Sequence, residues 1–464
     1  MKYKYHLWAC IMAVVMSCTA CQKAKTDDEI NNSNNQSQEM PTKEQESFAE
    51  KPNKSEISMN ALEELEQPVD ISDGTIDENP FVIDPVEEIE SIAEQIPQNT
   101  SGSAIQSASS TSIFANNSKA YIDDEGSTVG IRVHNNSITI TDVIDCKSNK
   151  ITIPAFIDQM PVVSIGSNAF ENADVVSVEI SEGITTIESQ AFYGNTTIKK
   201  ISIPKSISSI GSNAFGNCSS LEEFELSDQN KNYCLSNGVL YNKQKTSLIR
   251  YPAAKEDKTY QIEKGVVTIE AGAFSMSSKI EKVTFPDSLR SIETEAFAGC
   301  VSLDIDLPDK IIELESFAFA DCCSLSKIVV PKQIEEIAEG TFSGCENAVS
   351  IKFVGKVKEI GYSAFANCTS VSKIEFQDSV SKIGEMSFAF CSSLKNITLP
   401  EGTKEIADMA FYFCNSLESI TIPKTVTYLG SMIFDEDISL RIYTPKGSAA
   451  ENYAVSNGIA CEQQ

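Results

Sequence analysis

The sequence predicts a repeat solenoid built from short parallel β-strands and turns. The main observation is a phenylalanine that recurs every 22 or 23 residues, with a single step of 59 residues. The series consists of Phe170, Phe192, Phe215, Phe274, Phe297, Phe319, Phe342, Phe365, Phe388, Phe411 and Phe434. An apolar alternation and a proline that follows it recur in register with this series. Units of this length cannot bury their apolar side alone, so they must stack.

One repeat, residues 391–411, shows how each unit is predicted to fold. Leu394, Ile397 and Leu399 end in a period-two alternation, which indicates a short half-buried strand. Pro400 ends this strand, because proline has no N–H to donate to a sheet. A second short extended piece and a tight turn then carry Phe411 into the interior. We expect stacked copies about 4.8 Å apart, each strand bonded to the next coil, with sheet edges only at the two ends.

Two steps depart from the period. The 59-residue step contains the apolar runs 238–241 and 247–251, which flank a polar turn at residues 242–246. This pattern predicts a β-hairpin within an insert at residues 228–263. The 22-residue step from Phe297 to Phe319 lacks one residue of the strand at residues 303–307, where we expect a local irregularity rather than a break.

Both ends of the solenoid need a cap. Residues 119–165 are predicted to form an N-terminal β cap and the start of the first repeat, because residues 137–142 and 150–154 alternate cleanly. The repeats then fill residues 166–443. Residues 444–464 are predicted to form the C-terminal cap, with a short amphipathic helix at 448–458 that shields the last open edge.

Residues 1–17 are predicted to be a lipoprotein signal peptide. Lys2 and Lys4 precede an apolar run of eleven residues, which is too short to span a bilayer, since about 20 are needed. Residues 14–18 resemble a bacterial lipobox, which implies cleavage before Cys18 and lipidation of that residue. Cys21 is the alternative lipidation site, and an ordinary signal peptide with incidental cysteines is the competing interpretation.

The segment that follows, residues 18–118, is predicted to be an acidic disordered tether. Residues 22–118 hold 20 acidic and 5 basic residues, a net −15 out of −29 for the whole chain, and include polar low-complexity runs. This acidity argues against nucleic-acid binding, because phosphate contacts need concentrated Lys and Arg.

Residue usage argues against an enzyme. Of two histidines, His6 leaves with the signal peptide and His134 remains, which is too few for the usual zinc sites and triads. We therefore predict no catalytic residue, no metal and no cofactor. Paired carboxylates such as Glu335-Glu336 are interpreted as solvated surface charge. Glycines four residues before the repeated Phe alternate with Ala and Glu, so no special backbone geometry is predicted there.

Seven cysteines share one repeat position, three residues after the Phe. They are Cys218, Cys300, Cys322, Cys345, Cys368, Cys391 and Cys414. Ala173, Asn195 and Ser277 occupy the same position in other copies, so it selects small size. Neighbouring Cβ atoms about 4.8 Å apart exceed the ~3.5–4.5 Å of a disulfide. We predict a buried ladder of reduced thiols, with disulfides or a metal-binding ladder as alternatives.

Candidate binding residues lie at exposed strand positions and in the insert. The candidate binding face comprises Lys199, Lys200, Glu222, Glu223, Lys282, Lys327, Lys373 and Lys395. The candidate insert site comprises Tyr241, Lys243 and Lys245, because insertions in solenoids map to functional loops. The alternative is that the tyrosines only pack the irregular coil. Both lysines are expected to be exposed.

The repeat unit ISIPKSISSIGSNAFGNCSSL, residues 201–221, resembles the BspA-type bacterial leucine-rich repeat, and the resemblance covers about residues 150–443. It implies a leucine-rich repeat fold and a non-enzymatic surface protein, since several members act as adhesins. We therefore predict a protein lipid-anchored at the outer face of a bacterial membrane that binds an extracellular protein or glycan. The alternative is a structural or self-associating envelope scaffold without a dedicated ligand.

Overall fold

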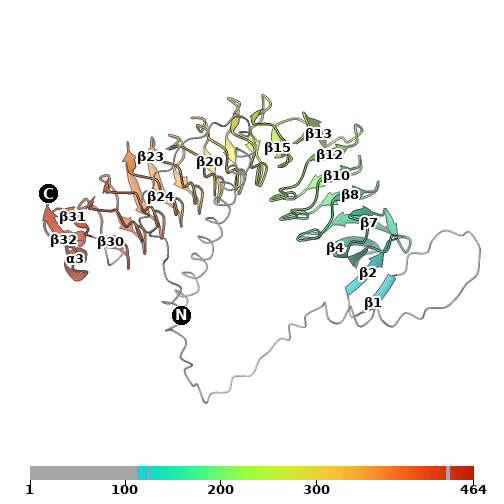
Figure 1. The fold of residues 1–464 in the computed structure, drawn as a ribbon, viewed down its shortest axis with the longest axis horizontal. Helices are drawn as coiled ribbons and strands as arrows, with labels where there is room; N and C mark the ends of the chain where they lie inside the picture. The colour runs from blue at the N-terminus through green and yellow to red at the C-terminus, as the bar shows by residue number, and fades with distance from the viewer. Residues whose placement is uncertain (1–111, 116–117, 124, 435–438) are drawn as a thin grey trace, which may run out of the picture. The chain divides into compact units, whose positions relative to one another are not determined.

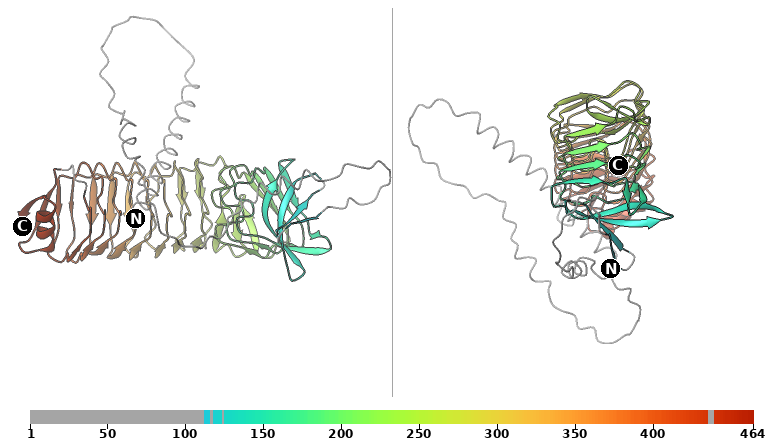
Figure 2. Two further views of the ribbon diagram at one scale, coloured as in Figure 1. Left: turned by 90° about the horizontal axis from the view of Figure 1, so that it is seen from below. Right: turned by 90° about the vertical axis from the view of Figure 1, so that its right-hand side faces the viewer.

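The chain folds as a parallel β-solenoid of about 14 turns, which confirms the fold class predicted from the sequence (Figure 1). The structure, a computed structural model, describes residues 112–115, 118–123, 125–434 and 439–464. The predicted signal peptide and nearly all of the predicted tether lie outside these residues. Successive coils lie side by side in sequence order, as the views in Figure 2 show.

Each coil contributes up to two strands, which belong to two series of parallel sheets. The A strands carry the predicted alternation and precede the proline. They are β5 (Lys150–Ile153), β8 (Ser177–Ile180), β10 (Lys200–Ile203), β12 (Glu223–Leu226), β16 (Thr259–Gln261), β18 (Lys282–Thr284), β21 (Ile328–Val330), β23 (Ser350–Phe353), β25 (Lys373–Phe376), β27 (Asn396–Thr398), β29 (Ser419–Thr421), β31 (Arg441–Thr444) and β32 (Ala460–Gln463).

The B strands follow the proline and correspond to the second extended piece of the repeat. They are β4 (Ser137–Asp145), β7 (Met160–Ile165), β9 (Thr186–Ile187), β11 (Ser209–Ile210), β15 (Ser247–Arg250), β17 (Thr268–Ile269), β19 (Ser291–Ile292), β20 (Glu313–Leu314), β22 (Glu336–Ile337), β24 (Val357–Ile360), β26 (Val380–Ile383), β28 (Glu405–Ile406) and β30 (Tyr428–Leu429). Pairing keeps the repeat register, as in Ile201↔Phe224 on the A side and Glu336↔Glu359 on the B side.

Neither series forms one uninterrupted sheet, so the expectation of edges only at the ends is wrong. The A strands form four sheets, which break between β12 and β16, between β18 and β21, and between β25 and β27. The B strands break after β11 and between β20 and β22. Residues 303–307 contain no strand, so the 22-residue step produces a break and not the predicted irregularity.

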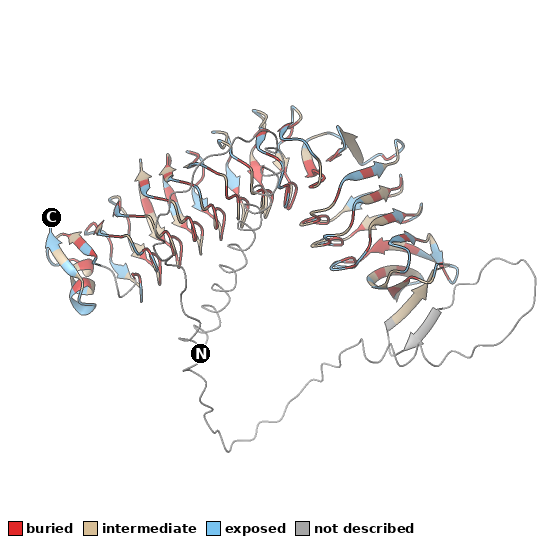
Figure 3. Cartoon of the chain, viewed as in Figure 1, coloured by how far each residue is buried: buried red, intermediate tan, exposed pale blue. Residues whose placement is uncertain are grey.

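The repeated phenylalanines line the interior and stack from coil to coil, as predicted. Ring centroids of consecutive pairs lie 4.6 to 6.0 Å apart, and the rings of Phe297 and Phe319 are within 4° of parallel. The N–H of most of these residues also donates to a carbonyl of the next coil, as in Phe297 to Ala318 at 2.8 Å; Phe215 and Phe434 are the exceptions among the described residues. This corner of the coil therefore carries a third backbone ladder. Figure 3 shows the buried residues along the inner side of the coils.

The turn around each Phe uses left-handed backbone at two fixed positions, which sequence reasoning missed. The residue two before the Phe has φ between +49° and +64°, and the residue two after it, where described, has φ between +54° and +74°. Glycine and asparagine tolerate this region well, whereas bulky residues rarely adopt it. Here Phe317, Met386 and Phe390 nonetheless adopt it, at φ of +57°, +52° and +63°. The frequent Gly and Asn at both positions were the signal that could have predicted the geometry.

The insert contains the predicted hairpin and one strand more. β13 (Tyr233–Ser236) pairs antiparallel with β14 (Val239–Asn242), which pairs antiparallel with β15. Tyr251 takes the place of the repeated Phe, because its N–H donates to the Ala273 carbonyl at 2.8 Å and its ring stacks on Phe274 at 5.1 Å. The 59-residue step is therefore a step of 36 followed by a regular step of 23.

The hairpin separates two clusters of buried apolar side chains. Leu240 and Ile249 pack in the N-terminal cluster, which begins at Val129. Val239 and Tyr241 pack in the C-terminal cluster, which extends to Ala454. The sheet formed by β14 and β15 thus has a separate core on each of its faces.

The N-terminal cap is an antiparallel sheet of β1 (Ser112–Ala115), β2 (Ser118–Ile122), β3 (Thr128–His134) and β4, with β6 (Phe156–Ile157) paired to β7. At the other end, α3 (Ala449–Ser456) begins after the predicted Ser448, whose hydroxyl accepts from the Glu451 N–H at 3.0 Å. β32 then pairs with β31, so β32 and not the helix stands at the sheet edge. The expectation that the helix shields this edge is corrected.

Candidate functional site

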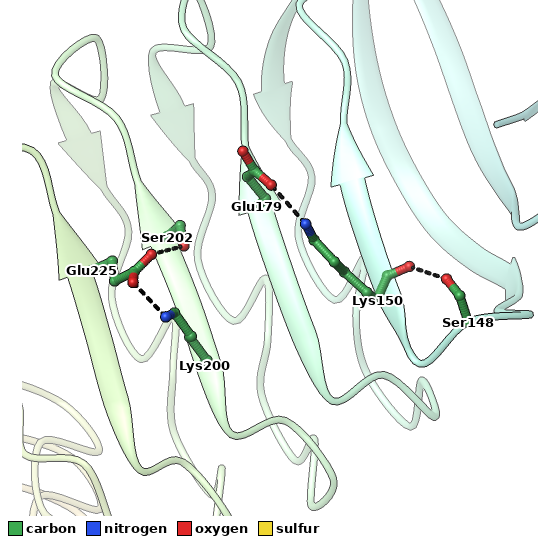
Figure 4. Close-up of polar contacts among 6 residues, drawn as sticks. All are labelled: Ser148, Lys150, Glu179, Lys200, Ser202 and Glu225. Atoms are coloured by element: carbon green, nitrogen blue, oxygen red, sulfur yellow. Dashed lines mark hydrogen bonds and ion pairs between the residues drawn. The ribbon is translucent and has the colours of Figure 1, made fainter. Parts of the chain in front are cut away.

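The candidate binding face predicted from the sequence is exposed but largely paired with itself. Lys199 binds Glu222 at 2.9 Å, and Lys200 binds Glu223 at 3.1 Å and also Glu225. Figure 4 shows the Lys200–Glu225 pair and the same arrangement two coils earlier, where Lys150 binds Glu179 at 2.9 Å. Opposite charges on adjacent strands satisfy each other, and such exposed pairs contribute little to stability because water screens them.

The remaining residues of that face do not join this group. Lys327 binds Asp306 at 3.1 Å and Lys373 binds Glu375, while Lys282 and Lys395 are exposed. The breaks after β12, β18 and β25 separate these lysines from Lys199 and Lys200. The structure therefore brings only Lys199, Lys200, Glu222 and Glu223 together, as a charge ladder. The hydrogen bonds that Lys200 donates to Glu225 and Glu223 raise the pKa of Lys200, as expected for such a ladder.

The insert site is mostly a packing element. Tyr241 is fully buried and its hydroxyl lies 2.6 Å from that of Tyr260, so its assignment as a contact residue is corrected. Burial raises the pKa of both tyrosines. Lys245, expected to be exposed, is half-buried and donates to Glu263 at 2.9 Å. Lys243 is exposed, as predicted, and donates to the Asn230 carbonyl at 2.8 Å.

A buried arginine, missed by the sequence reasoning, joins the coils on either side of the insert. Arg250 is 1% exposed and donates to the Ser275 hydroxyl at 2.9 Å, to the Gly272 and Ser275 carbonyls, and to the Cys218 carbonyl at 3.4 Å. Burial lowers its pKa to about 10. Because its partners come from both sides of the insert, Arg250 is a structural bridge and not a ligand-binding cation.

The seven repeated thiols are buried and free, in agreement with the predicted ladder. Each sulfur donates to the carbonyl of the Phe one coil earlier, as in Cys345 to Phe319 at 3.4 Å and Cys218 to Phe192 at 3.0 Å. Asn195 makes the equivalent bond to Phe170 with its amide nitrogen. The position therefore selects a small donor, and not small size alone. Burial raises the pKa of these thiols, for Cys300 to about 12, so they are not nucleophiles.

The strongest candidate for a binding site lies where two coils part on both sheets. We call this boundary the seam; it separates residues 303–319 from residues 325–342. On the A side, the Ser326 N–H bonds the carboxylate of Asp304 at 3.0 Å where other coils use a backbone carbonyl. On the B side, β20 pairs only with β19 and β22 only with β24. The Phe corner stays closed, since Phe319 donates to Thr341 at 2.8 Å.

A hollow of about 650 Å³ lies on the B side of the seam. Its lining comprises Thr294, Ile312, Glu313, Leu314, Glu315, Ser316, Gln333, Glu335, Glu336, Ile337, Ala338, Glu359 and Gly361. This volume falls within the ~300–1,000 Å³ typical of ligand sites. The pair Glu335-Glu336, interpreted from the sequence as solvated charge, thus lies at the hollow's wall.

The hollow is strongly acidic. Of its five glutamates, Glu335 pairs with Lys358 at 2.6 Å and Glu359 pairs with Lys382 at 2.9 Å. Glu313 accepts a hydrogen bond from Ser291 at 3.0 Å, so its charge stays uncompensated. Glu315 and Glu336 likewise have no lysine or arginine partner within the described residues. A row of like charges on adjacent strands is unfavourable, which favours a cationic partner.

The acidic row continues into the preceding coils through Glu293 and Glu270. Burial, with the Glu293 charge as a second cause, raises the pKa of Glu270 to about 7. Burial likewise raises the pKa of Glu293.

The sequence predicted no catalytic residue and no metal, and only the second point has a geometric counterpart in the part of the chain that the structure describes. No group of three or more His, Cys, Asp and Glu side chains there is placed to hold a metal ion. His134 is exposed at the end of β3. Cys18 and Cys21 lie outside the described residues. Within the described ranges, no helix has the length and apolar character that a membrane crossing requires.

The chain belongs to the BspA type leucine rich repeat family, whose model matches residues 136–256, 253–337 and 312–441 with six copies. This confirms the resemblance seen in the repeat unit. Members of this family are generally binding or scaffold proteins and not enzymes. No curated protein matches the chain significantly.

Three solved structures are similar to this chain. A leucine rich cell surface protein from Faecalibacterium prausnitzii is 26% identical, with 73% of this chain and 97% of that chain covered and a TM-score of 0.42. Leucine-rich repeat proteins from Eubacterium ventriosum (22% identity, 69% and 94% coverage, TM-score 0.45) and Bacteroides ovatus (20% identity, 74% and 99%, TM-score 0.37) are also similar. The family assignment rests on the repeat model, since these TM-scores lie below 0.5.

Proposed function

We propose that this chain is a non-enzymatic, lipid-anchored cell-surface protein whose solenoid binds an extracellular protein or glycan. The observation that carries the proposal is the BspA-type repeat over residues 136–441, in a chain whose first residues are predicted from the sequence to be a signal peptide with a lipobox. Stacked repeats present a long series of regularly spaced surface positions, which suits recognition better than catalysis.

The distribution of surface charge supports the same function. The repeated Phe, Cys and Ala residues serve packing and backbone bonding. The exposed charges near β10 and β12 form self-paired ladders, whereas the hollow at the seam keeps unpaired carboxylates. A ligand that neutralises those carboxylates has a physical reason to bind there.

Anchoring is tested with two matched cysteine variants. Cys18→Ala is expected to release the protein from membranes or leave it uncleaved, while Cys21→Ala is expected to leave fractionation unchanged. The reverse result moves the lipid to Cys21. Fully soluble secretion of the wild-type protein contradicts the anchor.

Binding is tested with the mature chain on immobilised matrix proteins, glycans and bacterial surfaces. Saturable binding supports the proposal, and uniform absence of binding contradicts it. Crosslinking separates the alternative, a self-associating envelope scaffold, because a scaffold yields abundant complexes of this chain with itself.

A further inference from the structure

The seam leaves four backbone groups without the partners that neighbouring coils supply. In intact coils the N–H four residues before the Phe donates to the previous coil, as in Glu315 to Ile292 at 3.0 Å and Gly361 to Ile337 at 2.8 Å. At the seam, the Ala338 N–H makes no such bond to the Leu314 carbonyl within the described residues. Here β20 and β22 present free sheet edges to each other.

The second missing bond lies three residues earlier. Ile312 donates to Arg290 at 2.9 Å on one side, and Lys358 donates to Glu335 at 2.6 Å on the other. The Glu335 N–H and the Ile312 carbonyl, which should meet between these bonds, are not joined in the described structure. The carbonyls of Ile312 and Leu314 thus lie on one side of the hollow, and the N–H groups of Glu335 and Ala338 lie on the other.

Unpaired strand edges are templates for another strand. We propose that an extended segment of a partner protein, with Lys or Arg alternating with apolar residues, adds as a β-strand between β20 and β22. Its N–H groups would meet the Ile312 and Leu314 carbonyls, and its carbonyls would meet the Glu335 and Ala338 N–H groups. The proposal names a site and a partner class within the binding role proposed above.

The intact sheet nearby shows what side chains such a strand would carry. In β26, Lys382 stands between Glu359 at 2.9 Å and Glu405 at 3.9 Å. The next residue, Ile383, is fully buried and pairs in register with Ile360 and Ile406. Between two strands that carry glutamates, this sheet thus accepts a strand with a basic residue on its outer face and an apolar residue on its inner face.

At the seam, β20 and β22 carry the same kinds of residue as the two neighbours of β26, but no strand lies between them. Glu313 and Glu336 are exposed at the outer positions, while Leu314 and Ile337 are 4% and 1% exposed at the inner positions. A lysine between the two glutamates and an isoleucine between the two apolar residues would reproduce the β26 pattern. The hollow of about 650 Å³ provides the room for the added segment.

A bare cation explains the seam less well than a strand. No three acidic, His or Cys side chains of the described residues are arranged to hold a metal ion. A cation would also leave the Glu335 and Ala338 N–H groups unpaired, because N–H groups do not ligate cations. A strand satisfies the donors, the acceptors and the charge together.

The test uses the full mature chain and a fluorescent, end-capped heptapeptide, Thr-Val-Lys-Ile-Lys-Val-Thr. Saturable binding by fluorescence anisotropy is expected, with loss of binding for a peptide in which Glu replaces Lys. Glu313→Gln with Glu336→Gln is expected to weaken binding about tenfold, since two opposite-charge contacts are lost. The matched control, Glu179→Gln with Glu281→Gln, removes the same charge from glutamates that pair with lysines and should change affinity less than about twofold.

Hydrogen exchange locates the added strand. In the free protein, amides in residues 333–339 should exchange faster than those in 356–362, and the peptide should protect 333–339 selectively. Absence of binding, equal effects of both double variants, or slow exchange of 333–339 without peptide would each overturn the inference. Protection of 333–339 by Ca²⁺ alone would overturn it in favour of a cation site. If the peptide fails while the chain still binds matrix proteins or glycans, the proposed function stands and only the seam is excluded.

Discussion

Replacing Phe365 with Ala should destabilise only the C-terminal of the two cores. Phe365 is fully buried, and its ring stacks on Phe342 at 5.4 Å and on Phe388 at 5.3 Å, with an edge contact to Phe353 at 5.6 Å. A buried Phe→Ala change costs ~3–5 kcal/mol, and the loss of three ring contacts places this one in the upper half of that range.

The loss should stop at the hairpin, because coupling in a solenoid passes between neighbours and the hairpin separates the cores. Hydrogen exchange followed by mass spectrometry resolves individual coils. Phe365→Ala should speed exchange in residues 342–411 and leave residues 150–203 unchanged. Phe192→Ala, the matched variant in the other core, should show the opposite pattern. Equal loss of protection in both regions after either change would refute the two-core reasoning.

Three further predictions concern the thiols, the acidic row and the insert. Cys345→Ala should lower the free energy of unfolding in urea by ~1–2 kcal/mol, because it leaves a void and removes the donor to the Phe319 carbonyl. Peptide mapping after maleimide treatment should find Cys345 and Cys368 unlabelled in the native protein, and rapid labelling would contradict their burial. Because the pKa of Glu270 is about 7 when folded and its ordinary value is 4.5, the unfolded chain loses this proton first, so unfolding free energy should fall as pH rises from 4.5 to 7 and then level off. Glu270→Gln should remove ~2–3 kcal/mol of that fall, measured by urea midpoints at pH 5 and 7.5, whereas Glu418→Gln, at an exposed position, should not. Lys245→Ala should cost at most ~1 kcal/mol through its pair with Glu263, and Lys243→Ala less; a larger loss would show that the hairpin tip supports the core.

The coil, the Phe stack and the hairpin were predictable because they follow from local patterns. Alternation sets the strand, proline ends it, and a constant period places Phe297 over Phe319 without knowledge of distant contacts. The thiol ladder followed from the same period, although its hydrogen bonds did not, because a small side chain says nothing about which carbonyl it meets. The left-handed turns could also have been predicted, from the Gly and Asn that recur at the two positions in many of the repeats.

Tertiary structure alone decided where the sheets break. The missing residue near Asp304 is visible in the sequence. Whether the two coils then pair or separate depends on how their backbones meet at the A strands, the B strands and the Phe turn together. For the same reason, the sequence indicated only ordinary surface charge at Glu335-Glu336. These residues line a hollow because β22 does not pair with β20. Arg250 is the parallel case in the core: its burial follows from the insert bringing Cys218 and Ser275 to one guanidinium, a contact between residues distant in the chain.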